Sequence, residues 1–118
     1  MEKTAIGRDG EQAAVAYLKK KGFRIVETNY RVAGAEVDII AVSGMILCFI
    51  EVKTRKSGEF GLPEDFVHRA KQRKIIRAAK FFSARKAYRE HRVRFDVVSI
   101  IRLDGGMSFD HLENAFEE

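Results

Sequence analysis

The chain has 118 residues, of which 46% are hydrophobic and 33% are charged, as expected for one globular domain spanning 1–118. These proportions exclude a disordered, collagenous or low-complexity chain. The single cysteine, Cys48, cannot form an internal disulfide, which favours a reducing, cytoplasmic environment. The longest apolar run, residues 46–50, is far shorter than the roughly 20 residues of a membrane span, so we expect no membrane partner.

The net charge of +5 is distributed unevenly along the chain. Residues 68–94 contain 11 Lys and Arg residues and one acid, so this segment carries +10 while the rest of the chain carries −5. Positive charge of this density is easiest to explain if a polyanion neutralises it, and nucleic acid is the leading candidate. The alternative is a solvated helix face that keeps a small basic protein soluble.

The hydrophobic pattern predicts six elements in the order α-β-β-β-α-β. These are a helix at 4–21, strands at 23–30, 35–42 and 45–54, a helix from 63 to about 86, and a strand at 93–103, before a Gly105–Gly106 turn and a short tail. The strands on either side of the second helix should be parallel, because a crossover helix joins them. We therefore predict an α/β sandwich, with a central mixed β-sheet flanked by helices.

The second and third strands are predicted to form a hairpin whose two-residue loop is Ser43–Gly44. In this register Asp38 lies diagonal to Glu51, on the same face of the sheet. Lys53 and Glu36 share this face, and apolar residues occupy the opposite one. A slip of one residue would move the carboxylates to the apolar face, so the alternation itself supports the predicted facing.

The carboxylates of Asp38 and Glu51 are close enough in this register to converge on one ion. Mg²⁺ is typically held by one or two carboxylates and several waters, and it then binds substrate phosphate. Lys53 could hold a water or stabilise the charge that develops on a phosphate. The alternative is a salt-bridge cluster on a solvated sheet face.

Asp38 followed after thirteen residues by Glu51-Val52-Lys53 resembles the active-site signature of the PD-(D/E)XK nuclease superfamily, which has a restriction-endonuclease-like, three-layer fold. The proline of that signature is replaced here by Val37. Further motifs resemble the bacterial YraN-like family. They include Gly7-Arg8, Gly10-Glu11, Tyr17-Leu18, Asn29-Tyr30-Arg31, Glu36-Val37-Asp38, Phe49-Ile50-Glu51-Val52-Lys53-Thr54-Arg55, Phe60-Gly61, Pro63 and Arg94-Phe95-Asp96.

The fold of this family is similar to that of archaeal Holliday junction resolvases, which are dimeric, metal-dependent enzymes that cut four-way DNA junctions. The resemblance implies that Asp38 and Glu51 are ligands of Mg²⁺ or Mn²⁺ and that Lys53 is the catalytic lysine. It further implies that Glu11 is the helix-borne acid near the metal and that the protein forms a homodimer. A helix-surface role is the alternative for Glu11.

Other candidates surround this set. Glu36 is either an outer carboxylate near the metal or an ion-pair partner of Arg31 or Arg55, and Gln72 could orient a water or phosphate or be exposed and inert. Lys71 places a cation on the apolar stripe of the second helix, where it could reach the site or the DNA, or snorkel. The predicted nucleic-acid contacts are Lys71, Arg73, Lys74, Arg77 and Arg55. The three histidines lack the spacing of a zinc site.

Three functions fit these features. The first is a metal-dependent endonuclease that hydrolyses DNA phosphodiester bonds and selects its substrate by structure. The second is a non-catalytic nucleic-acid-binding module, and the third is a subunit active only with a partner. Because carboxylates beside phosphate repel it, the presence of Asp38, Glu51 and Lys53 together favours the enzyme.

Overall fold

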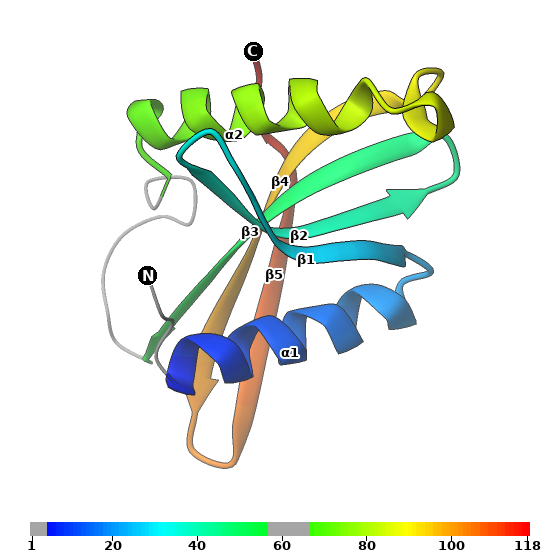
Figure 1. Ribbon diagram of the computed structural model, residues 1–118. Coiled ribbons are helices and arrows are strands. Elements are labelled where there is room, and N and C mark those ends of the chain that lie inside the picture. Colours follow the sequence, from blue (N-terminus) through cyan, green and yellow to red (C-terminus); the bar gives the residue numbers. More distant parts are fainter. Residues whose placement is uncertain (1–4, 57–66) are drawn as a thin grey trace.

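The computed structural model describes residues 5–56 and 67–118. A five-stranded sheet lies between two helices that cover its opposite faces (Figure 1), so the predicted α/β sandwich is confirmed. In chain order the elements are α1 (Ala5–Lys20), β1 (Arg24–Val32), β2 (Ala35–Ser43), β3 (Ile46–Lys56), α2 (Arg69–Ser83), the short 3₁₀ helix η2 (Lys86–Tyr88), β4 (Arg92–Leu103) and β5 (Gly106–Phe116).

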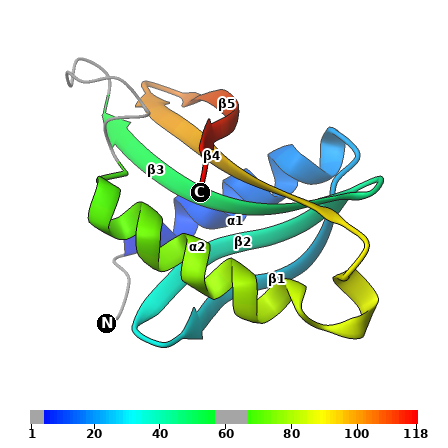
Figure 2. The ribbon, with the colours of Figure 1, turned by 90° about the horizontal axis from the view of Figure 1, so that it is seen from above.

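The sheet has the spatial order β1-β2-β3-β4-β5. The β3–β4 pair is parallel and the other pairs are antiparallel, as the predicted crossover through α2 requires. Seen from above, α2 crosses one face of the twisted sheet and α1 crosses the other (Figure 2). The sheet is therefore mixed, and both of its faces are partly covered by a helix.

Two apolar clusters form the core, one on each face of the sheet. Leu18 of α1 belongs to the same cluster as Ile39 of β2, whereas Phe82 of α2 belongs to the cluster that contains Ile40 and Phe49. The Phe49 and Phe82 rings meet edge to face, with centroids 6.0 Å apart. The adjacent residues Ile39 and Ile40 of β2 thus pack in opposite clusters, because successive side chains of a strand point to opposite faces.

The predicted hairpin register between β2 and β3 is wrong by two residues. Ser43 pairs with Ile46, so the loop is Gly44–Met45 rather than Ser43–Gly44. Gly44 adopts a φ of 59° at the first loop position, a conformation that glycine accepts without strain. A shift of two residues does not by itself change the facing of a side chain, but Val37 packs in the cluster of Ile40 rather than in that of Ile39, where strict alternation places it.

Two other boundaries differ from the sequence prediction. The second helix ends at Ser83 rather than near residue 86, and η2 then brings the Tyr88 ring to 5.3 Å from the Phe82 ring. The helix begins at Arg69 after an extended His68, so the prediction of helix is wrong at residues 67–68, while the predicted start at Pro63 lies outside the described residues. The expected tail is instead strand β5, which pairs with β4 through a loop at Asp104–Gly105. An Asp-Gly pair is a strong hairpin signal that the prediction overlooked.

Candidate functional site

The candidate site lies where β2 and β3 separate. Their backbone pairing extends to Ile39 and Ile50, and beyond this point β2 pairs with β1 while β3 pairs with β4. Asp38 Oδ2 accepts a hydrogen bond of 2.8 Å from the backbone N–H of Val52, so a side chain replaces the next backbone contact between the strands. If this register is continued by one residue, Asp38 lies directly opposite Glu51, so the two residues are closer to each other than in the predicted diagonal arrangement.

Glu51 is the most buried acid of this site, with 2% of its side chain exposed. Its Oε2 forms an ion pair of 2.6 Å with Lys71 Nζ of α2, while Oε1 is buried and accepts no hydrogen bond from the described residues. Burial, followed by the charge of Asp38, raises the pKa of Glu51 to about 7, against the opposing charges of Lys71 and Lys53. This carboxylate is therefore held in an environment that lacks sufficient positive charge.

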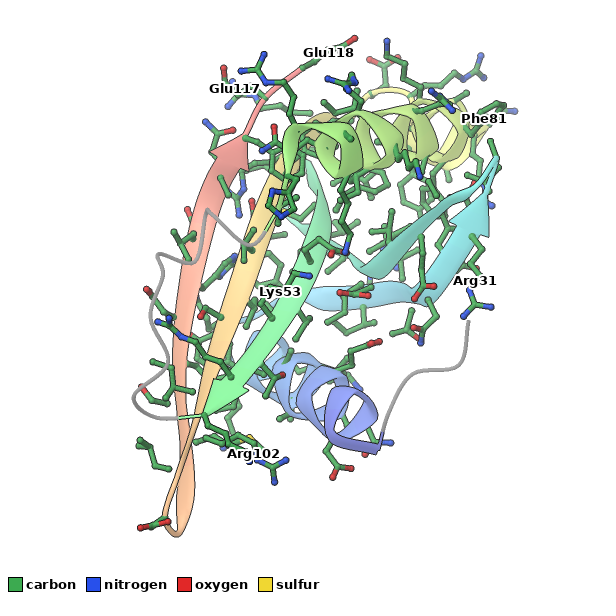
Figure 3. All side chains as sticks on the ribbon, turned by 90° about the vertical axis from the view of Figure 1, so that its left-hand side faces the viewer. Arg31, Lys53, Phe81, Arg102, Glu117 and Glu118 are labelled. Atoms are coloured by element: carbon green, nitrogen blue, oxygen red, sulfur yellow. The ribbon has the colours of Figure 1, made fainter. Side chains whose placement is uncertain are left out.

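Lys53 and Lys71 converge on the same carboxylates from β3 and α2. Burial and then the charge of Lys71 lower the pKa of Lys53. For Lys71 burial acts downward, but Glu51 and Asp38 outweigh it and raise the pKa of the ammonium. With all four groups ionised, two carboxylates face two ammonium groups and the formal charge of the cluster is zero. In Figure 3 Lys53 lies on β3, between the levels of the two helices.

The remaining acidic candidates are Glu36 and Glu11. Arg31 Nε donates to Glu36 Oε2 at 3.0 Å, which is one of the two ion pairs expected for Glu36, and Arg31 lies well apart from Lys53 in Figure 3. Glu11 is 9% exposed on α1, next to Gly10, where an added Cβ would collide with Thr54 Oγ1 of β3. Because Thr54 and Lys53 point to opposite faces, α1 approaches β3 from the face opposite to Lys53. The role of Glu11 near a metal stays a prediction.

The basic candidates divide into one inward residue and an exposed set. Lys71 reaches Glu51, whereas the other predicted cations of α2 point to solvent and Arg55 is half-buried two residues beyond Lys53 on β3. The exposed set is Arg73, Lys74 and Arg77. Gln72 Nε2 donates to the Val67 backbone oxygen at 2.9 Å, a contact that stabilises the start of α2, and its action on water or phosphate stays a prediction.

The donor set fits a divalent cation that keeps much of its water. Across residues 5–56 and 67–118, no group of three or more His, Cys, Asp or Glu side chains is placed to hold a metal. Asp38 and Glu51 supply two carboxylates, and the unpartnered Glu51 Oε1 is a buried acceptor suited to a cation. Mg²⁺ is commonly bound in this way, by one or two carboxylates and waters. Asp38 and Glu51 would hold the ion.

Another buried carboxylate, whose structural role the sequence analysis missed, lies on β4. Asp96 is fully buried and accepts hydrogen bonds from Arg94, from His111 Nε2 at 2.8 Å and from the Asn114 backbone N–H at 3.0 Å. Burial would raise its pKa, but these hydrogen bonds and the Arg94 charge lower it overall. The signal was an aspartate inside the otherwise apolar run Phe95–Val98, but His111 and Asn114, two of its three partners, belong to β5, which had not been predicted.

A groove of about 620 Å³ lies away from the candidate site. It runs between the C-terminal half of α2 and strands β4 and β5, and its lining includes Lys80, Arg94, Glu113 and Glu118. Lys80 and Glu118 form an exposed ion pair of 2.6 Å there, beside the end of β5 seen in Figure 3. Arg94 and Glu113, also in the lining, pair at 3.6 Å, so both of these acids have a basic partner within the groove.

The fold and the site define an α/β protein with a carboxylate–lysine cluster where two strands of its sheet separate. The model of the uncharacterised protein family UPF0102 matches residues 10–100, and the chain belongs to this family. A UPF0102 protein of Dictyoglomus thermophilum is 42% identical over 118 residues, covering 98% of this chain and all of the relative. Relatives from Alkaliphilus metalliredigens and Chlorobium phaeobacteroides are 41% and 44% identical, covering 95% and 94% of this chain and 97% and 93% of their own.

These comparisons confirm the resemblance at the level of the family. Within the described part of the chain, no helix is both long enough and apolar enough to span a membrane.

Proposed function

We propose that the protein is a metal-dependent endonuclease of the PD-(D/E)XK type, which hydrolyses phosphodiester bonds of DNA and selects its substrate by structure. The observation that carries the proposal is Glu51, a buried carboxylate beside Asp38 that keeps an unpartnered oxygen and a pKa of about 7. Retaining such a group costs stability unless a cation compensates it, so its presence points to function.

Each residue of the cluster has a separate role in this reaction. Asp38 and Glu51 would hold the cation, and the hydrogen bond from Val52 N–H keeps the Asp38 carboxylate turned toward the opening between the strands. When bound, Mg²⁺ or Mn²⁺ supplies positive charge to the phosphate oxygens and favours deprotonation of the attacking water. Lys53 would donate hydrogen bonds to the same phosphate, where negative charge grows in the transition state.

The exposed cations of α2 support nucleic acid as the partner. Arg73, Lys74 and Arg77 lie on the same helix as Lys71, so one helix presents both a cation inside the site and a basic surface outside it. Such cations contact phosphates, which position the duplex without reading its sequence. Selection by shape is therefore the favoured mode, and a homodimer would present two such sites to a branched DNA.

The experiment compares cleavage and binding on the same substrates. Labelled duplex, single-stranded, flapped and four-way-junction DNA are incubated with Mg²⁺, Mn²⁺ or EDTA, and the mass of the protein is measured by light scattering. We expect metal-dependent cleavage that falls by at least about 100-fold in Asp38→Asn and in Lys53→Ala, because each removes a group acting on the transition state. The controls are Asp104→Asn in the β4–β5 loop and Lys56→Ala, an exposed lysine of β3.

A non-catalytic nucleic-acid-binding module is the second candidate. It is favoured by the ion pair between Lys71 and Glu51, which helps to bring the formal charge of the cluster to zero without a metal. A binding module predicts DNA binding without cleavage under any metal. In either case, replacing Arg73, Lys74 and Arg77 by Ala should reduce the salt dependence of binding, by about 0.9 in log–log slope for each phosphate that the protein no longer neutralises. Lys19→Ala with Lys20→Ala, on α1, is the matched control.

A further inference from the structure

Lys71 occupies an unusual position for a residue of a basic helix surface. Its ammonium lies 2.6 Å from Glu51 Oε2, although 42% of its side chain remains exposed, so it joins the buried carboxylate to solvent. Its neighbours Arg73, Lys74 and Arg77 point to solvent instead. Through Lys71, α2 therefore contacts the candidate site.

The position of Lys71 conflicts with full use of Glu51 by a cation. A carboxylate oxygen that pairs with an ammonium at 2.6 Å is not available to a second positive ion, and Lys53 already supplies another ammonium close by. The long, flexible side chain of a lysine can leave one anion for another without moving the backbone. Its exposure gives it a path away from Glu51, toward the outer surface of α2.

We infer that Lys71 is an exchangeable counter-cation, which neutralises Glu51 in the metal-free protein, yields it to a divalent cation, and then binds a phosphate of the nucleic acid. This inference rests on the proposed function, because it assumes the metal and the phosphodiester substrate. With the cation bound and Lys71 still beside the substrate phosphate, the cluster has a formal charge of +2. This charge is equal and opposite to that of a phosphodiester under attack by hydroxide, which carries about two negative charges.

The first test measures Mn²⁺ binding by titration calorimetry, without nucleic acid, at pH 8.5. Lys71→Met keeps the length of the side chain and removes its charge, so we expect Mn²⁺ to bind about tenfold more tightly than in the wild type. Lys71→Arg should weaken Mn²⁺ binding severalfold, because the guanidinium can hold the carboxylate with two hydrogen bonds. Lys74→Met, at an exposed lysine on the same helix, should leave the Mn²⁺ affinity unchanged. Circular dichroism verifies that each variant is folded.

The second test measures binding to four-way-junction DNA in EDTA and in Ca²⁺, with gels scored for intact DNA. In EDTA, Lys71 is engaged with Glu51, so Lys71→Met should bind DNA within about twofold of the wild type. In Ca²⁺ the released lysine contacts phosphate, and Lys71→Met should lose about fivefold in affinity. Lys74→Met should lose the same factor in both buffers.

The outcomes separate this inference from the proposed function. If Mn²⁺ affinity is the same in the wild type, Lys71→Met and Lys71→Arg, Lys71 is a fixed structural partner and the inference is overturned. The proposed function then still stands, provided that the wild type binds Mn²⁺ and cleaves DNA. If the wild type binds no Mn²⁺, both the inference about Lys71 and the proposed function are overturned. Opposite shifts in Lys71→Met and Lys71→Arg, together with a Ca²⁺-dependent loss of DNA binding, support the exchange.

Discussion

Asp96 and Glu51, the two most deeply buried acids of the described residues, lie on adjacent parallel strands, but their surroundings are opposite. Asp96 accepts hydrogen bonds from Arg94, His111 and Asn114, and these contacts lower its pKa although it is fully buried. Among the described residues, Glu51 forms one ion pair, with Lys71, and its Oε1 accepts no hydrogen bond, and its pKa rises to about 7. The difference teaches that burial alone does not indicate function: a satisfied carboxylate stabilises the fold, whereas an unsatisfied one is suited to bind a cation.

The largest effect on stability is expected from Asp96→Ala. Removing this carboxylate leaves the Arg94 guanidinium and His111 without their buried partner, so the free energy of unfolding should fall by about 3–5 kcal/mol. Urea denaturation followed by circular dichroism measures the change. Asp110→Ala, an exposed aspartate of β5, is the control. A decrease below about 1 kcal/mol would show that Asp96 is not the structural acid of the pair.

The pH dependence of stability should distinguish Glu51 from Asp96. The folded pKa of Glu51 is raised from 4.5 to about 7, so in EDTA its contribution is fully favourable below pH 4.5 and is lost as the pH rises through 7. The loss is on the order of 3 kcal/mol. Asp96, whose pKa is lowered, contributes above its unfolded pKa and loses that contribution only as the solution becomes more acidic.

Urea denaturation between pH 4.5 and 8 tests this prediction. Glu51→Gln should flatten the profile, while Glu90→Gln, in an exposed turn, should leave it unchanged. An identical profile in the wild type and Glu51→Gln would refute the raised pKa.

A divalent cation should stabilise the protein through Glu51 and not through Asp96. At a concentration about 100 times its dissociation constant, Mn²⁺ should add about 2.7 kcal/mol to the free energy of unfolding of the wild type. Asp96→Ala should keep this increment, whereas Glu51→Gln and Asp38→Asn should lose it. Thermal unfolding with and without Mn²⁺ provides the measurement, and an equal increment in all four proteins would place the cation elsewhere.

The smallest effect is expected at the exposed ion pair between Arg31 and Glu36. The Arg31 side chain is 55% exposed, so Arg31→Gln should change the free energy of unfolding by less than about 1 kcal/mol. High salt should reduce the effect further, because the pair is screened. A decrease as large as that of Asp96→Ala would contradict the distinction between exposed and buried pairs. Urea denaturation at two salt concentrations measures the change in the free energy of unfolding caused by Arg31→Gln.

The main elements of the fold could be predicted because they depend on local periodicity. The first helix and the first four strands were found within a few residues of their predicted bounds, and the parallel crossover was correct. The hairpin loop was misplaced at Ser43–Gly44, since the sequence alone does not fix which loop position glycine takes. Strand β5 was missed because its apolar alternation is interrupted after His111, where the pairing with β4 is irregular.

The candidate site was predicted in part for the same reason. From the alternation of strand side chains the sequence predicted that Asp38, Glu51 and Lys53 come together, and in the structure the charges of Asp38 and Lys53 both act on Glu51. Only the tertiary structure decided that Lys71 pairs with Glu51 and that Asp96 is satisfied by His111 and Asn114. Those contacts join residues 15–20 positions apart across separate elements, so they depend on how helix and strands pack, which periodicity does not determine.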